Sequence, residues 1–68
     1  MSNIDIFLHK LRYTVLLKMS KILQLRVSQQ EIFNASLNQN IDKSIHDLEN
    51  ISKNRNLIIY KLFYNSKL

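Results

Sequence analysis

Residues 57–68, LIIYKLFYNSKL, constrain the structure most strongly, because seven of the first eight residues are apolar or aromatic. Helical spacing places Ile58 and Leu62 on one side of this stretch, and Tyr60 and Tyr64 on another. A helix that is apolar on two faces cannot bury both of them against one neighbouring helix. A chain of 68 residues is too short to surround such a helix with its own core. The stretch therefore predicts a protein partner.

The composition favours a few long helices. The sequence contains no glycine, no proline and no cysteine. Tight turns between strands depend mainly on glycine, proline, asparagine or aspartate, and here only asparagine-rich stretches remain. Without cysteine there is no disulfide, and the two histidines, His9 and His46, are too far apart in sequence to suggest structural zinc. Association is the support that remains for so small a fold.

An apolar stripe runs along the first half of the chain at spacings of three and four residues, which predicts one long helix over about residues 3–37. Ser2 and Asp5 are suited to cap its N-terminus. The polar run at residues 28–30 is where we expect any bend or break. The stripe consists of Ile4, Phe7, Leu8, Leu11, Val15, Met19, Ile22 and Leu25, and continues with Ile32, Phe33 and Leu37.

Residues 38–40, Asn-Gln-Asn, are the expected turn. Asn38 tolerates the left-handed conformation that ends a helix where glycine is lacking, and Asn40 is a suitable N-cap for a second helix over about residues 41–65. We expect the polar run 52–56, SKNRN, to stay helical, with a break there and three helices as the alternative. The apolar stripe of the second helix is Ile41, Ile45, Leu48, Ile51, Ile58 or Ile59, and Leu62.

Two long helices joined by three residues run antiparallel, so we expect an all-α, single-domain helical hairpin with coiled-coil-like pairing. Because both helices rise equally per residue, paired residue numbers sum to about 78. A second apolar stripe on the first helix then lies at the same end as the surplus face of the second. Clustered exposed apolar residues usually mark interfaces, and a homodimer of the free chain is the alternative use of this surface. The candidate partner-binding residues are Ile6, Tyr13, Leu17, Leu57, Tyr60 and Tyr64.

No catalytic arrangement is recognisable, and we expect a protein that is not an enzyme and needs no cofactor. The sequence has no cysteine nucleophile and no glycine-rich phosphate loop, and its five acids show no pairing suited to acid–base chemistry. Asp42, His46 and Glu49 recur at i, i+4 and i+7 as one polar row on the second helix. Such a row is far more often a solvated face than a metal site, so we expect no bound metal.

The net charge of +5 raises nucleic acid and anionic membranes as partners. The lysines and arginines are spread over both expected helices, so a small basic DNA- or RNA-binding regulator is the alternative to a protein-binding module. No apolar run approaches the length of a membrane span, and the N-terminus lacks a signal-peptide pattern. We therefore expect a soluble cytoplasmic protein.

Two stretches resemble a known family. Residues 22–26, ILQLR, which follow the Leu8-His9 pair, and residues 57–68 are similar to the small type III secretion needle co-chaperones of the YscE/SsaE/EscE type. The likeness is greatest to the version found in virulence-island systems of enteric bacteria. It implies a two-helix antiparallel hairpin without an active site, acting in the bacterial cytoplasm. It also implies that the chain binds a tetratricopeptide-like chaperone, and that the two together keep the needle subunit monomeric and soluble before export.

Overall fold

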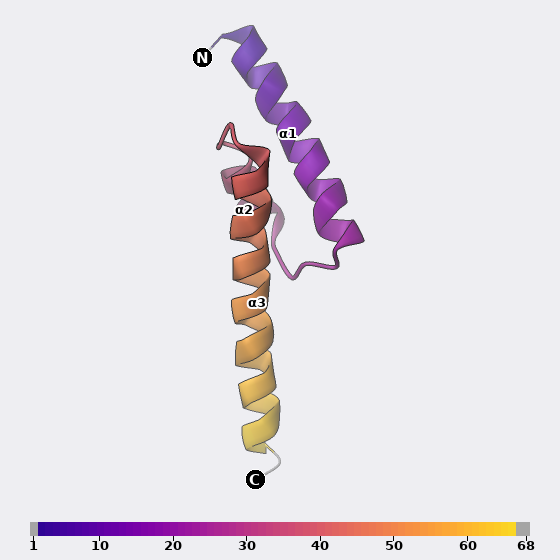
Figure 1. The fold of residues 1–68 in the computed structure, drawn as a ribbon, viewed down its shortest axis with the longest axis vertical. Coiled ribbons are helices and arrows are strands. Elements are labelled where there is room, and N and C mark those ends of the chain that lie inside the picture. The colour runs from indigo at the N-terminus through magenta and orange to yellow at the C-terminus, as the bar shows by residue number, and fades with distance from the viewer. Residues whose placement is uncertain (1, 67–68) are drawn as a thin grey trace.

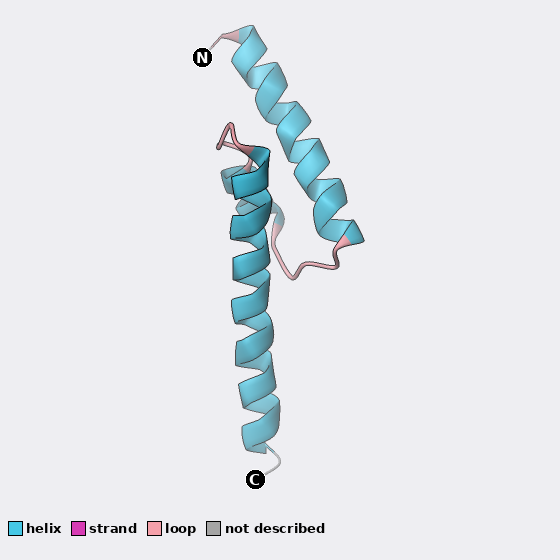
Figure 2. Ribbon diagram, in the orientation of Figure 1, coloured by secondary structure: helices cyan, strands magenta, loops and turns pink. Residues whose placement is uncertain are grey.

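The computed structural model describes residues 2–66, and every regular element in that range is a helix (Figures 1 and 2). Helix α1 spans Asn3–Ile22, α2 spans Gln29–Ala35, and α3 spans Ile41–Ser66. The all-α prediction is therefore confirmed. The two-helix hairpin is not confirmed, because three helices form within the described residues.

Helix α1 begins at the residues that the sequence indicates. The Ser2 hydroxyl accepts a hydrogen bond from the Asp5 amide at 3.2 Å, and the Asp5 carboxylate accepts one from the Ser2 amide at 3.4 Å. This reciprocal pair is a capping box, and it satisfies two amide groups that have no partner inside the helix.

Helix α1 ends in a reversal that uses no glycine. Gln24 adopts the left-handed conformation, with φ of 55°. The Leu25 amide donates to the Ser20 carbonyl at 2.9 Å and the Gln24 amide donates to the Lys21 carbonyl at 3.2 Å. These two bonds are those of a Schellman motif, in which glycine usually occupies the position held here by Gln24.

The single helix expected over residues 3–37 is therefore wrong, and the local bonds explain why. Beyond the reversal, the Ser28 hydroxyl accepts from the Glu31 amide at 3.2 Å, and the Glu31 carboxylate accepts from the Ser28 amide at 2.8 Å. This second capping box starts α2 at Gln29. The break lies next to the polar run at residues 28–30, where the sequence indicated it.

The turn before α3 matches the prediction at one of its two asparagines. The Asn40 side chain accepts from the Lys43 amide at 3.2 Å, as expected of an N-cap. Asn38 does not adopt the left-handed conformation, so that prediction is wrong; its side chain instead accepts from the Asn40 amide at 2.8 Å. Residues 52–56 are helical within α3, as expected.

The three helices run down, up and down, so α1 and α3 point in the same general direction and α2 opposes both (Figure 1). Two bonds fix this order. The Arg12 side chain, midway along α1, donates to the Ser36 carbonyl at 2.8 Å, and the Arg26 amide, just after α1, donates to the Ser52 hydroxyl at 2.8 Å. The antiparallel arrangement expected for the first and last helical segments is therefore wrong, because the break reverses the chain.

The expected register nevertheless holds between α3 and the segment that precedes it. The Ser44 hydroxyl donates to the Ala35 carbonyl at 2.6 Å, and Arg26 meets Ser52 as described. Both pairs fit the rule that paired residue numbers sum to about 78. The fold-back at residues 38–40 thus sets the register of α2, and of the loop before it, against α3.

The core takes one buried apolar residue from each helix: Leu16 from α1, Ile32 from α2 and Leu48 from α3. The partly buried residues packed against it are Tyr13, Leu17, Leu25, Val27, Ala35, Ile41, Ile45 and Ile51. The stripe expected for the second helix is therefore correct as far as Ile51.

The stripe expected to bury α1 is wrong. Ile4 and Ile22 are 70% and 73% exposed, while Leu16 and the partly buried Tyr13 and Leu17 face the core. Helix α1 is apolar on two sides. The break separates α1 from α2, so the rotation of α1 about its own axis no longer depends on that of α2. The side of α1 opposite the expected stripe then packs against the other helices.

Helix α3 extends beyond the part of the chain that packs against it. It continues past the point where Arg26 meets Ser52, and every residue from 53 to 66 is exposed. The molecule is therefore elongated, with extents of 55 × 21 × 17 Å. We refer to residues 53–66 as the projecting segment. It forms the yellow end of α3, near the point marked C in Figure 1.

Candidate partner-binding surface

The projecting segment exposes a continuous apolar sequence. It has no glycine or proline, so α3 continues through it although, beyond Arg55, none of its apolar residues belongs to the core. Its exposed large apolar residues are between 45% exposed, at Ile59, and 65% exposed, at Leu62. They are Leu57, Ile58, Ile59, Tyr60, Leu62, Phe63 and Tyr64.

These residues cover two opposite sides of the helix. Ile59 and Leu62 continue the side of α3 that packs on the core further up, at Leu48. Tyr60 and Tyr64 lie across the helix from them, and their rings stack with centroids 6.4 Å apart and an angle of 19° between the planes. The segment therefore offers apolar surface to a partner that contacts it from more than one side.

The charge of the chain is concentrated at this end. Residues 50–68 contain four basic residues and no acidic one, whereas residues 1–49 contain six basic and five acidic ones. The C-terminal nineteen residues thus carry +4 of the net +5. The basic residues are spread over whole helices, so this charge asymmetry becomes visible only when the projecting segment is compared with the rest of the chain.

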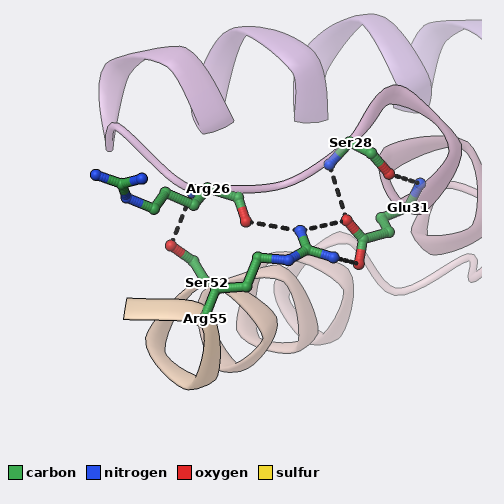
Figure 3. Close-up of polar contacts among 5 residues, drawn as sticks. All are labelled: Arg26, Ser28, Glu31, Ser52 and Arg55. Atoms are coloured by element: carbon green, nitrogen blue, oxygen red, sulfur yellow. Dashed lines mark hydrogen bonds and ion pairs between the residues drawn. The ribbon is translucent and has the colours of Figure 1, made fainter. Parts of the chain in front are cut away.

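An ion pair fixes the base of the projecting segment (Figure 3). The Arg55 guanidinium donates to both carboxylate oxygens of Glu31, at 2.6 and 2.8 Å, and to the Arg26 carbonyl at 2.9 Å. Such bidentate pairs are strong and geometrically specific. Arg55 thereby ties α3 to the capping box of α2 and to the loop at residues 23–28.

The same contacts shift both ionisation equilibria. Hydrogen bonds from the Arg55 side chain and the Ser28 amide lower the pKa of Glu31 from 4.5 to about 2. The hydrogen bond to Glu31 raises the pKa of Arg55. Both side chains therefore stay charged at neutral pH.

The six candidate partner-binding residues are not brought together. Leu57, Tyr60 and Tyr64 lie on the projecting segment, and Leu17 packs against the core. Ile6 and Tyr13 lie on α1, which runs alongside the other end of α3 (Figure 1). The prediction that they meet depends on antiparallel helices, whereas α1 and α3 run in the same general direction.

Ile6 and Tyr13 instead line a groove of about 370 Å³ between α1 and α2. Phe33 forms its α2 side, and the His9 ring meets the Phe33 ring edge-on, with centroids 4.7 Å apart. Lys10 and Thr14 complete the lining. This groove is separate from the projecting segment.

Sequence reasoning missed that Ile58, Ile59 and Leu62 are exposed, because it assigned them to the core stripe. Their pattern is that of a core face. What exposes them is the break after Ile22, which leaves α1 too short to reach them. The weakness of the stripe around residues 28–30 was the one signal of this in the sequence.

Within residues 2–66, no three histidine, cysteine or acidic side chains are grouped so that they could hold a metal ion. Among the described helices, none combines the length and the hydropathy needed to span a membrane.

Comparisons of the chain with protein-family models, with curated proteins and with solved structures find no match.

Proposed function

We propose that the protein is a binding module whose projecting segment docks into a groove on another protein. The observation that carries this proposal is the exposed apolar segment of α3, which extends beyond the core of its own chain. Clustered apolar side chains rimmed by polar ones are typical of protein interfaces.

A concave protein groove fits this segment better than a flat surface does. A helix lying on a membrane needs a wide polar face opposite one apolar face. Here Ile59 and Leu62 lie across the helix from Tyr60 and Tyr64, so both sides need cover. Stacked helical repeats form extended concave surfaces of the required kind.

The more specific form of the proposal is a type III secretion co-chaperone in the bacterial cytoplasm. It is supported by the resemblance of residues 22–26 and 57–68 to the YscE/SsaE/EscE type, and the second stretch largely coincides with the projecting segment. The partner is then a tetratricopeptide-like chaperone, and the two proteins together mask the polymerising surface of the needle subunit. The resemblance also implies a two-helix hairpin, and in such a hairpin the partner contacts the Tyr60 and Tyr64 side of the segment.

The test is a native, nuclease-treated pull-down from the host, with intact-complex mass spectrometry, followed by affinity measurement on the purified pair. We expect recovery of a helical-repeat protein, with or without a small needle-like subunit. The double change Tyr60→Ser and Tyr64→Ser should weaken the purified complex at least tenfold, because aromatic anchors dominate interface energies. Helicity by circular dichroism should stay unchanged.

Phe7→Ser is the matched control, since it removes an exposed aromatic side chain from α1 instead. Equal affinity of the double variant and the unmodified chain sinks the assignment of this surface. Recovery of the chain only with itself sinks the partner proposal and leaves the homodimer.

The alternative function is a small basic DNA- or RNA-binding regulator, and the concentration of positive charge at the C-terminal end favours it. Binding through phosphate contacts weakens steeply as salt rises, because counterions are released. Titration of a duplex at several salt concentrations decides the matter: absent or salt-independent binding removes this alternative.

A further inference from the structure

We propose that the chain exchanges between this three-helix form and a two-helix hairpin, in which residues 23–28 become helical and α1 swings round to cover the projecting segment. The inference rests on the proposed function only in naming that segment as the binding surface. It concerns how access to the surface is regulated.

The sequence carries a heptad seam that the three-helix form does not use. Alternating steps of four and three residues keep one phase from Ile4 to Ser36, across the break. The positions are apolar except at Lys18, Gln29 and Ser36. On α2 this seam faces inward, with Ile32 buried in the core. On α1 most of it faces outward, leaving Leu11 and Ile22 exposed, while Val15 is half-buried. The seam keeps the same heptad phase before and after the break, but it is buried only after the break, on α2. This mismatch indicates a second arrangement of the helices.

Helix α3 carries the complementary half of the seam. The same steps of four and three run from Ile41 to Ser66, with the polar Ser52 and Arg55 in the middle. They include Leu48, which is buried, and Ile59 and Leu62, which are exposed. Two stretches of seam are thus uncovered in the three-helix form, one on α1 and one on the projecting segment. One change of conformation brings them together.

The register for that change is already present. Pairing of Ala35 with Ser44 and of Arg26 with Ser52 follows the sum of about 78. Continued along a helical segment 23–28, the same rule places Met19 beside Ile59 and Val15 beside Leu62. The contacts of α2 with α3 remain where they are.

Residues 23–28 contain no residue that prevents this. They read LQLRVS, without glycine or proline, and the break is held by Gln24 in a left-handed conformation that is unfavourable for a residue with a β-carbon. Helix formation removes this cost and covers Ile22, Ile59 and Leu62. It gives up the burial of Leu16, the Ser28–Glu31 capping box, and the bonds from Arg12 to Ser36 and from Arg26 to Ser52.

The consequence is competition for one surface. In the hairpin, α1 covers the Ile59 and Leu62 side of the projecting segment, whereas in the three-helix form that side is open. A partner that needs this side selects the three-helix form, and the hairpin protects it while the partner is absent.

The test measures one distance in the free chain. The protein has no cysteine, so Lys10→Cys and Asn65→Cys can be spin-labelled selectively for pulsed electron paramagnetic resonance. In the three-helix form Lys10 lies near the start of α3, because Arg12 bonds Ser36. At about 1.5 Å rise per residue, Asn65 is then about 35 Å away. In the hairpin the two positions lie almost level, and we expect labels within about 20 Å.

Two substitutions at one position provide the matched pair. Gln24→Gly favours the left-handed conformation and weakens the helix, whereas Gln24→Ala does the opposite. We expect the ratio of short to long distance to be about tenfold or more higher in the alanine variant than in the glycine variant. Dilution with unlabelled chain separates distances within one chain from those between chains.

A single long distance in both Gln24 variants overturns the proposal. So does a short distance that is equal in both, or one that disappears on dilution with unlabelled chain. Because no partner is present, failure here leaves the Tyr60 and Tyr64 binding test unaffected.

Discussion

The four buried polar residues of the described chain are all serines: Ser20, Ser36, Ser44 and Ser52. Their small side chains let the helices approach closely, and three of them have hydrogen-bond partners. Ser36 donates to the Phe33 carbonyl at 2.6 Å, Ser44 to the Ala35 carbonyl, and Ser52 accepts from the Arg26 amide. The Ser20 hydroxyl is buried and makes no hydrogen bond within residues 2–66.

Ser20→Ala should therefore stabilise the fold. It removes a buried hydroxyl without a partner and improves helix propensity, which together raise the free energy of unfolding by about 1 kcal/mol. Ser52→Ala is the contrasting change, because it strands the Arg26 amide and lowers the free energy of unfolding by about 1 to 2 kcal/mol. Urea denaturation measures both, and a destabilised Ser20→Ala variant contradicts the assignment.

Glu31 makes the stability of the fold depend on pH in the acidic range. Its pKa in the folded chain, about 2, is lower than its ordinary value of 4.5, so the unfolded chain binds a proton more readily. Its contribution to stability is complete above pH 4.5 and is lost as the pH falls toward 2.

Glu31→Gln should flatten that dependence, because glutamine keeps the capping geometry but has no charge to lose. We expect the variant to be less stable than the unmodified chain at pH 7 and to approach it at pH 3. Glu49→Gln, which removes an exposed carboxylate from α3, serves as the control. Parallel stability curves for Glu31→Gln and the unmodified chain, measured by urea denaturation, contradict the prediction.

At the scale of elements, α3 consists of two parts with different roles. Residues 41–52 supply the core with Leu48 and the partly buried Ile41, Ile45 and Ile51. None of residues 53–66 is buried, and in isolation a helix of about this length is marginal in water.

Leu16→Ala and Leu62→Ala should separate these parts. Leu16 is fully buried, so its truncation costs about 3 kcal/mol, a large share of the stability of so short a chain. Leu62 is largely exposed, so its truncation should change the free energy of unfolding by less than about 0.5 kcal/mol. Thermal denaturation at low protein concentration gives both values, and a comparable loss in the two variants contradicts the division.

Local signals in the sequence predicted the elements well, and the arrangement less well. The caps at Ser2 and Asn40 depend on neighbouring residues alone, and both were predicted. The reversal at Gln24 was not, because glutamine is not a residue that signals the left-handed conformation. From that one residue followed the direction of α1, the side of it that is buried, and the separation of Tyr13 from Tyr60.

The candidate surface was likewise predicted in part. The surplus apolar faces of residues 57–64 could be read from their spacing, since no arrangement of so short a chain covers them all. Their separation from Ile6, Tyr13 and Leu17 could not, because it depends on the relative direction of two helices.

Over the whole molecule, charge and apolar exposure are gathered at the same end. The projecting segment carries Lys53 and Lys61 beside its apolar side chains, with no acid after Glu49. Charges at the rim of an interface speed association more than they strengthen the final complex. A groove that binds this segment, as proposed above, should therefore have an acidic rim.

Lys53→Ala with Lys61→Ala should slow association with the partner severalfold at low salt, with a smaller effect on dissociation. Lys18→Ala with Lys43→Ala removes the same charge from the rest of the molecule and should change the association rate less. Surface plasmon resonance at two salt concentrations measures both rates. Equal slowing by the two pairs points to net charge alone.

The projecting segment also gives a protease an exposed place to cut the chain. It can open locally without disturbing Leu16, Ile32 or Leu48, so a protease that cuts near Lys61 need not wait for global unfolding. A bound partner closes that route. Intact chain should therefore accumulate only in proportion to the partner that shelters it, and surplus copies should be degraded from their C-terminal end.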